Sequence, residues 1–299
     1  MVLDPTEVIK IIFIAGDGRS GSTLLDAVLS NIEGSISVGE CHRFWVRFEE
    51  NEARCSCSEI MQDCTLWAEV EKQIQAKFPD YNVSEFEKKV REIQFYKNFK
   101  NIPFLLQSKK WIHFAEVVNA FYKAISEITG SQCIIDSSKS MPWAYVLQHM
   151  TDFDVRVIHL ERNLAAVGNS WKKTVRLPEY TEREVFMPKK GNVLVAKTWL
   201  KIKAMGRVLK RDPQYHFVNY RMLCKNPNTE LKKIMELVDE NIPLKELRVR
   251  PSHAIGGNPM RSSLEKIEIK NTTPTYKHLS FFDRLFFNAT SGLAKIFLS

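Results

Sequence analysis

The chain has no long hydrophobic run. Its first apolar segment, VIKIIFIA at residues 8–15, has the length of a β-strand, and the N-terminus MVLDPTEVIK carries acids ahead of it. A membrane-spanning helix needs about 20 apolar residues, and a secretory signal begins with basic residues. Neither description fits this terminus. We therefore expect a cytoplasmic protein without stable membrane insertion.

The chain also lacks a block of basic residues. Its net charge of +8 is modest for 299 residues, and no Lys/Arg run is long enough to form a nucleic-acid-binding arm. Small anionic ligands would explain the positive charge as well. A hydrophobic content of 44% can fill the core of one large α/β domain or two small ones. Because no repeat or low-complexity linker interrupts the chain, we expect a single domain over residues 1–299.

Cysteine is sparse and unevenly placed. Of the six cysteines, Cys41, Cys55, Cys57 and Cys64 lie in one segment, while Cys133 lies in a strand-like run. This is not typical of a secreted domain held together by disulfides. Zinc ribbons use C-x-x-C pairs, so C-x-C followed seven residues later by a lone cysteine is a poor match. The spacing favours free thiols or a local disulfide over zinc, and we assign no metal.

Hydrophobic periodicity alternates between strand and helix along the chain. Runs rich in β-branched residues predict strands at 8–15, 35–38, 132–136, 155–160 and 215–220. Helical patterns occur at 22–30, 65–78, 84–100, 110–128, 142–150, 164–174, 192–211 and 227–239. The alternation predicts an α/β fold with a doubly wound, mostly parallel sheet. A helical insertion at about 65–128 is expected to shape an acceptor pocket, and an amphipathic helix at about 279–298 to dock on the core rather than on a membrane.

The octet GDGRSGST at residues 16–23 follows the first predicted strand and nearly satisfies two phosphate-binding patterns. Gly16, Gly18 and Gly21 form the G-x-G-x-x-G of dinucleotide-binding proteins, and the same octet approaches a P-loop in which Ser22 replaces the lysine. Without that lysine, a triphosphate lacks the cation that neutralises its charge during phosphoryl transfer. Arg19 suits a different anion, because a guanidinium at a helix N-terminus can clamp two oxygens of a phosphate or sulfate.

Two further strand ends carry candidate anion-binding side chains. Lys139 follows the third predicted strand and should project from the carboxyl edge of the sheet. Arg162 follows the fourth, and Ser170 lies eight residues later, two helical turns along, where both side chains could contact one phosphate. Three such sites on successive strand ends argue against a chance arrangement.

Several functions are consistent with these residues alone. An NAD(P)-dependent oxidoreductase could use Glu40, which closes the second strand-like run, to bind a ribose. A P-loop nucleotide kinase could hold magnesium with Asp136 or Glu161. A nucleotide-binding scaffold without activity would need no further group.

Taken together, the motifs resemble those of sulfotransferases that use 3′-phosphoadenosine 5′-phosphosulfate (PAPS). The resemblance is carried by GRSGSTLL after a strand, Gly-Glu at the end of the next strand, DSSKS and R-x7-S. The stretches FVNYRMLCKNPNTELKKIMELV and HAIGGNPMR are similar to the carboxy-terminal part of this family, especially its bacterial small-molecule or carbohydrate-type branch. The resemblance implies a P-loop-like fold and metal-independent transfer of a sulfuryl group to a hydroxyl or an amine. The acceptor would be a small molecule, lipid or glycan.

The resemblance also implies which residues hold the donor. The 5′-phosphosulfate would be bound by Arg19 with the amides and hydroxyls of Ser20, Gly21, Ser22 and Thr23. The remaining contacts would come from Arg162 and Ser170 at the 3′-phosphate, Tyr220 near the adenine, and Arg261 in a late loop that closes over the donor.

For catalysis, the resemblance implies Glu40 as the general base and Lys139 as the donor of a hydrogen bond to the bridging oxygen, with Arg19 sharing the charge. His42 is the alternative base, because two residues along an extended segment place it on the same face as Glu40. The chain departs from the family where relatives commonly read Tyr-Glu-Asp-Leu and Arg-Asp-Pro. It has YRML from Tyr220 and RNL from Arg162.

Overall fold

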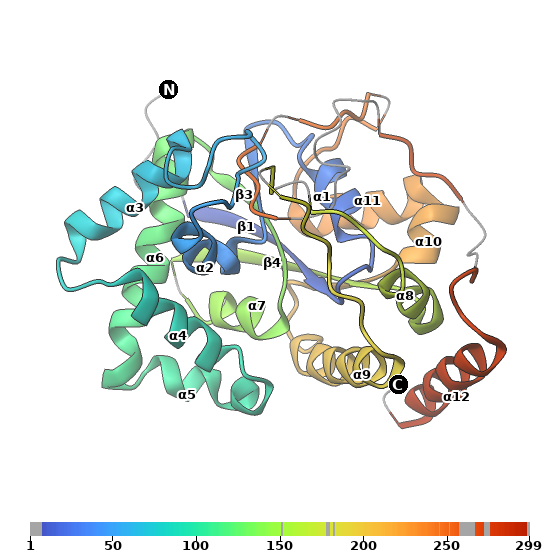
Figure 1. The fold of residues 1–299 in the computed structure, drawn as a ribbon. Helices are drawn as coiled ribbons and strands as arrows, with labels where there is room; N and C mark the ends of the chain where they lie inside the picture. The colour runs from blue at the N-terminus through green and yellow to red at the C-terminus, as the bar shows by residue number, and fades with distance from the viewer. Residues whose placement is uncertain are drawn as a thin grey trace.

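The computed structural model describes residues 8–150, 152–177, 180–181, 183–244, 246–250, 252–256, 267–271 and 276–297. Within these residues, five parallel strands form one sheet in the order β2-β3-β1-β4-β5, and helices cover both faces (Figure 1). The predicted α/β fold with a doubly wound parallel sheet is confirmed.

The strands form where the apolar runs predict them. They are β1 (Ile9–Gly16), β2 (Ser35–Gly39), β3 (Cys133–Lys139), β4 (Phe153–Glu161) and β5 (Tyr215–Asn219). In the central strand β1, Ile11 and Phe13 pack into one hydrophobic cluster, while Ile12 and Ile14 pack into another. Successive side chains of a strand point to opposite faces, so a strand buried on both sides reads as a continuous apolar run.

The helices divide between the two faces of the sheet. The cluster around Ile12 and Ile14 is covered by α1 (Ser22–Leu29) and α11 (Pro227–Val238). The cluster around Ile11 and Phe13 is covered by α7 (Met141–Gln148), with Leu209 of α9 (Asn192–Leu209) packed into it. The right-handed crossovers of a doubly wound sheet place helices in this way.

A group of helices between β2 and β3 lies to one side of the sheet (Figure 1). These helices are α2 (Phe44–Glu49), α3 (Thr65–Lys77), α4 (Val83–Ile93), α5 (Ile102–Leu106) and α6 (Lys109–Thr129). Several of their large aromatic side chains belong to the core, as shown by the full burial of Trp45, Trp67, Trp111, Phe114 and Phe121. That this group is an insertion in a single domain stays a prediction.

Several predicted boundaries differ from the observed ones, and two of these differences have a clear local cause. The helix expected over 84–100 ends at Ile93, and a 3-10 helix (Tyr96–Asn101) follows. The side chain of Asn98 donates a hydrogen bond to the backbone carbonyl of Glu92 at 2.8 Å. This bond satisfies one of the carbonyls that the end of α4 leaves without an intrahelical partner. The strand expected over 215–220 ends one residue early.

Tyr220 begins a short helix, α10 (Tyr220–Lys225), instead of ending β5. The side chain of Asn219 accepts hydrogen bonds from the amides of Arg221 and Met222 at 3.0 and 3.2 Å. This is the geometry of a helix N-cap, which the apolar pattern of the strand does not reveal.

The last described helix, α12 (Phe281–Phe297), packs on α8 (Leu164–Trp171) and α9. It does so through a narrow stripe that includes the buried Phe287 and Ala294. The helix therefore docks on the core as expected, although much of its other surface is apolar and exposed. Among the described residues, no helix has the length and hydropathy to cross a bilayer.

Candidate functional site

The register of the sheet brings the predicted site residues to one edge. Ala15 at the end of β1 pairs with Lys139 on one side and with His159 on the other, and Gly16 pairs with Leu160. The residues that follow β1, β3 and β4 therefore surround the same loop.

A cavity of about 550 Å³ opens at this carboxyl edge. The predicted site residues among those that line it are Arg19, Gly21, Ser22, Thr23, Lys139, Arg162, Ser170 and Tyr220. Ser20 lies beneath them, fully buried in the loop. Arg261 lies outside the described residues.

The loop from Gly16 to Gly21 has the features of an anion cradle. Gly21 has a φ of 101°, and a Cβ on it would lie 2.2 Å from the ring of Tyr220, so only glycine fits there. No side chain caps α1, whose first amides therefore face the loop without a side-chain acceptor. The buried Ser20 Oγ has no hydrogen-bond partner in the described structure. An anion at this position would satisfy these donors.

Two of the predicted cationic residues have an unusual backbone conformation. Arg19 has a φ of 70° and Lys139 a φ of 67°, in the left-handed region that residues with a Cβ rarely adopt. Such conformations cost on the order of 1 kcal/mol or more and concentrate at functional sites, where surrounding structure enforces them. Both side chains line the cavity.

Arg19, Arg162 and Ser170 lie together at the cavity. Arg19 Nε donates to Ser170 Oγ at 3.1 Å, and Arg162 Nη1 donates to the Arg19 carbonyl at 3.1 Å. Asn163 caps α8 by accepting from the amides of Ala165 and Ala166, which starts the helix that carries Ser170. Burial and the charge of Arg162 lower the pKa of Arg19. The two guanidiniums thus form a positive region that favours an anionic ligand.

Glu40 and Lys139 form an ion pair beside the cavity. Lys139 Nζ donates to Glu40 Oε1 at 2.6 Å, and Arg43 Nη1 lies 3.4 Å from Glu40 Oε2. Both side chains of the pair are 16% exposed. Burial alone would raise the pKa of Glu40, but Lys139 and Arg43 together outweigh it and lower the pKa to about 2. Glu40 is therefore ionised at neutral pH and holds Lys139 in place.

The alternative base, His42, lies in the same charged group. Its backbone amide donates to Ser138 Oγ at 3.1 Å, while its buried Nδ1 has no hydrogen-bond partner in the described structure. Burial lowers its pKa to about 3, and the charges of Arg43 and Lys139 act in the same direction. His42 is thus neutral at pH 7.

The acids expected for a magnesium-dependent kinase do not face the cavity. Asp136 is fully buried and accepts hydrogen bonds from the Tyr122 hydroxyl and the Ser138 amide. Burial raises its pKa to about 6. Glu161 pairs with Lys203 at 2.9 Å. Neither acid lines the cavity, which argues against the kinase interpretation.

Several lining residues were not predicted. Trp171, Lys173, Met187 and Lys270 also line the cavity, and Arg19 Nη1 lies 3.2 Å from Met187 Sδ. Trp171 and Lys173 could have been inferred from their position directly after Ser170. Met187 and Lys270 carry no local signal, because only tertiary packing brings them to the cavity.

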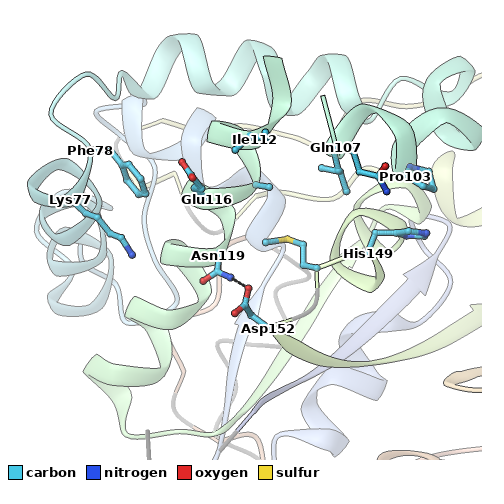
Figure 2. A pocket seen from close by; sticks show the side chains of 12 residues that line it. Lys77, Phe78, Pro103, Gln107, Ile112, Glu116, Asn119, His149 and Asp152 are labelled. Carbon is cyan, nitrogen blue, oxygen red and sulfur yellow. Dashed lines mark hydrogen bonds between the residues drawn. The ribbon is translucent and has the colours of Figure 1, made fainter. Parts of the chain in front are cut away.

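A second cavity of about 630 Å³ lies within the helical group (Figure 2). Lys77 of α3, Pro103 of α5 and Ile112 of α6 line it, together with Phe78, Met150 and Asp152. The last two precede β4, so this cavity lies at the amino edge of the sheet, opposite Lys139. None of the predicted site residues lines it.

The comparisons with known proteins point to one family. The family model of the sulfotransferase domain matches residues 10–268, which is most of the chain. No curated protein sequence matches the chain.

Sulfotransferases are among the solved structures that are similar to this chain. The sulfotransferase domain of the curacin biosynthetic pathway is 16% identical, with 96% of this chain and 99% of that chain covered and a TM-score of 0.50. The sulfotransferase domain of the Synechococcus PCC 7002 olefin synthase is 17% identical, with 97% of each chain covered and a TM-score of 0.48. Mouse sulfotransferase SULT7A1 complexed with PAP is 10% identical, with 94% and 82% covered and a TM-score of 0.44. The extent of the family match confirms the resemblance of the motifs: the chain belongs to the sulfotransferase family.

Proposed function

We propose that this chain transfers a sulfuryl group from PAPS to a hydroxyl or amine of a small-molecule, lipid or glycan acceptor, with Glu40 as the general base. The observation that carries the proposal is the convergence of Arg19, Lys139 and Arg162 on one cavity at the carboxyl edge of the sheet. Family membership supports sulfuryl transfer in general. The donor and the residue roles are our assignment.

The residues around the loop fit a donor with two anionic ends. Arg19 and the segment from Ser20 to Thr23 would hold the 5′-phosphosulfate, because the uncapped start of α1 and the unpartnered Ser20 Oγ offer hydrogen-bond donors there. Arg162 and Ser170 would hold the 3′-phosphate. The contact between Arg19 Nε and Ser170 Oγ at 3.1 Å supports placing the two proposed sites side by side.

Two further groups complete the proposed donor site. The Tyr220 ring lies 4.9 Å from the Arg162 guanidinium and lines the same cavity, so it would present a face to the adenine. Arg261 belongs to the proposal through the family resemblance alone.

The donor supplies an activated sulfuryl group, whose bond to the bridging phosphate oxygen breaks as a bond to the acceptor oxygen or nitrogen forms. Lys139 hydrogen-bonds that bridging oxygen as negative charge builds on it, and Arg19 shares the charge. Glu40 takes the proton of the acceptor. Negative charge near Lys139 competes with Glu40 for the ammonium, which raises the pKa of Glu40 from its low value toward one useful for a base.

The proposal is tested with the Glu40→Gln variant, in which catalytic turnover and binding of the bisphosphate are measured separately. We expect wild-type protein supplied with PAPS to add the mass of one sulfuryl group to an acceptor from a panel of hydroxyls and amines. Glu40→Gln should lower kcat by at least about 100-fold, because a general base contributes about 10² to 10⁴. The variant should still be stabilised against heat by adenosine 3′,5′-bisphosphate.

The control is His42→Gln, which should keep kcat within a few-fold of wild type. Loss of activity in His42→Gln with retention in Glu40→Gln would assign the base to His42. Stabilisation of wild type by ATP with magnesium or by NADPH, but not by the bisphosphate, would overturn the proposed donor. Binding of the bisphosphate without sulfation of any acceptor would favour a scaffold.

A further inference from the structure

Three cysteines and one histidine meet at a point that the proposed reaction does not use. Cys55 and Cys57 lie on a tight hairpin in which Arg54 pairs with Ile60 and the Cys55 amide donates to the Glu59 carbonyl at 2.9 Å. Cys64 comes directly before α3. The fourth group, His253, comes from a segment 189 residues further along the chain.

The ligand atoms of these four residues lie close enough together to hold one metal ion. Cys57 Sγ and Cys64 Sγ are 3.7 Å apart, and His253 Nδ1 lies 3.2 Å from Cys64 Sγ and 3.8 Å from Cys55 Sγ. All four atoms lie within 4.8 Å of one another. A tetrahedron with Zn–S bonds of about 2.3 Å and a Zn–N bond of about 2.0 Å has edges of roughly 3.5 to 3.8 Å. Disulfide sulfurs, at about 2.05 Å, would be much closer.

We propose that the chain binds one structural Zn²⁺ through Cys55, Cys57, Cys64 and His253. Thiolate and imidazole are the ligands that zinc prefers, and Cys₃His is a common set for closed structural sites. Four protein ligands leave no open position, so the ion stabilises the fold and takes no part in sulfuryl transfer. The cysteine spacing alone favoured free thiols or a local disulfide, because it does not reveal the distant His253.

Hydrogen bonds around the four ligands join the same segments. Trp67 Nε1 donates to the His253 carbonyl at 2.8 Å. The Ser56 amide donates to the Ala254 carbonyl at 3.1 Å, and the Ala254 amide donates to Ser56 Oγ at 2.8 Å. These bonds hold the ligands in place, as outer-shell contacts do in metal sites. Zinc would fasten the hairpin and α3 to the segment from Ser252 to Gly256.

That segment continues to the backbone of the proposed base. The Ile255 amide donates to the Val38 carbonyl at 3.0 Å, and the Glu40 amide donates to the Ile255 carbonyl at 2.8 Å. A Cβ on Gly39 would lie 2.6 Å from the Ile255 carbonyl oxygen, so the end of β2 and the segment around Ile255 approach closely. The zinc site would therefore position the end of β2 and, through it, Glu40.

Metal content and Co²⁺ spectra of the full chain test this inference without reference to activity. Protein purified under reducing conditions without chelator should contain about one zinc per chain, released by a mercurial thiol reagent. Protein reconstituted with Co²⁺ should show the intense visible bands of tetrahedral cobalt together with a thiolate charge-transfer band. Removal of zinc should lower Tm.

A matched pair of variants locates the ion. Cys57→Ser should lose most of the zinc, whereas Cys224→Ala, which removes a cysteine outside the cluster, should keep it. The inference is overturned by reduced wild-type protein that holds only trace zinc and gives no tetrahedral Co²⁺ spectrum. It is also overturned by an intact mass showing a disulfide among the three cysteines, or by full zinc content in Cys57→Ser. The wild-type spectrum decides the matter even if Cys57→Ser fails to fold.

Discussion

Lys139 and Glu40 form a pair whose members have different roles in the proposed transfer. Lys139 stabilises charge on the leaving oxygen, which develops only as the bond breaks, so Lys139→Ala should lower kcat by about 100-fold or more. The Kd for adenosine 3′,5′-bisphosphate should change by less than about tenfold, because Arg19 and Arg162 still hold the anionic groups. Steady-state kinetics and calorimetry would give the two values. If Lys139→Ala lowered kcat and the affinity for the bisphosphate by the same factor, Lys139 would be a binding residue only.

Because His159 is buried, we expect the stability of the folded state to depend on pH. His159 is 3% exposed, and its Nδ1 lies 2.6 Å from the Tyr215 hydroxyl. Burial, with a smaller effect of Lys203, lowers the pKa of His159 to about 3. The ordinary histidine pKa is about 6.5. Burial of the neutral imidazole therefore contributes in full to the stability of the folded state above pH 6.5. That contribution is lost as the pH falls toward 3, at about 1 kcal/mol per pH unit.

Thermal unfolding at pH 7.5 and pH 5.5 measures this effect. The fall in Tm between the two pH values should be smaller in His159→Gln than in wild type. His113→Gln, at a residue whose side chain is 43% exposed, should follow wild type. The same fall in all three proteins would contradict the assignment.

At the scale of elements, α12 packs on α8, the helix that carries Ser170, a proposed donor-binding residue. Phe287 is fully buried, and a Cβ on Gly168 of α8 would lie 2.3 Å from its ring. Phe287→Ala should therefore lower the free energy of unfolding by about 3 to 5 kcal/mol. It should also weaken binding of the bisphosphate, because Ser170 lies on α8. Urea unfolding and calorimetry measure the two effects.

The matched control for this helix is Phe282→Ala, since Phe282 is 77% exposed. Its loss of unfolding free energy should be within about 0.5 kcal/mol, as for most surface substitutions. If Phe287→Ala behaves like Phe282→Ala, α12 does not hold α8.

The sequence predicted those elements whose signal is local. β1 is recognisable because a central strand is apolar on both faces, and Lys139 and Arg162 could be placed together because parallel strands end at one edge. The end of α4 and the start of α10 were missed because Asn98 and Asn219 act through single side-chain hydrogen bonds. Such bonds leave no periodic pattern.

At the scale of the whole molecule, contacts between distant segments were the hardest to predict. His253 meets the three clustered cysteines only when the carboxy-terminal segment returns to the sheet. The pairing of Ile255 with the end of β2 depends on the same return. The proposed donor motifs could be recognised in the sequence because each is a short segment at the end of a strand. The acceptor site has no such motif, and the cavity in Figure 2 lies at the opposite edge of the sheet.

The central claim is that Arg19 and Arg162 hold two separate anionic groups of one adenine-containing donor. Calorimetric titration of wild type and Arg162→Ala with adenosine 3′,5′-bisphosphate and with adenosine 5′-phosphate tests it most directly. A charge-assisted contact to the 3′-phosphate should make wild type prefer the bisphosphate by about 10-fold to 100-fold, because such bonds contribute about 1.5 to 3 kcal/mol. Arg162→Ala should lose most of this preference. Failure of wild type to bind the bisphosphate, or an unchanged preference in Arg162→Ala, would contradict the account.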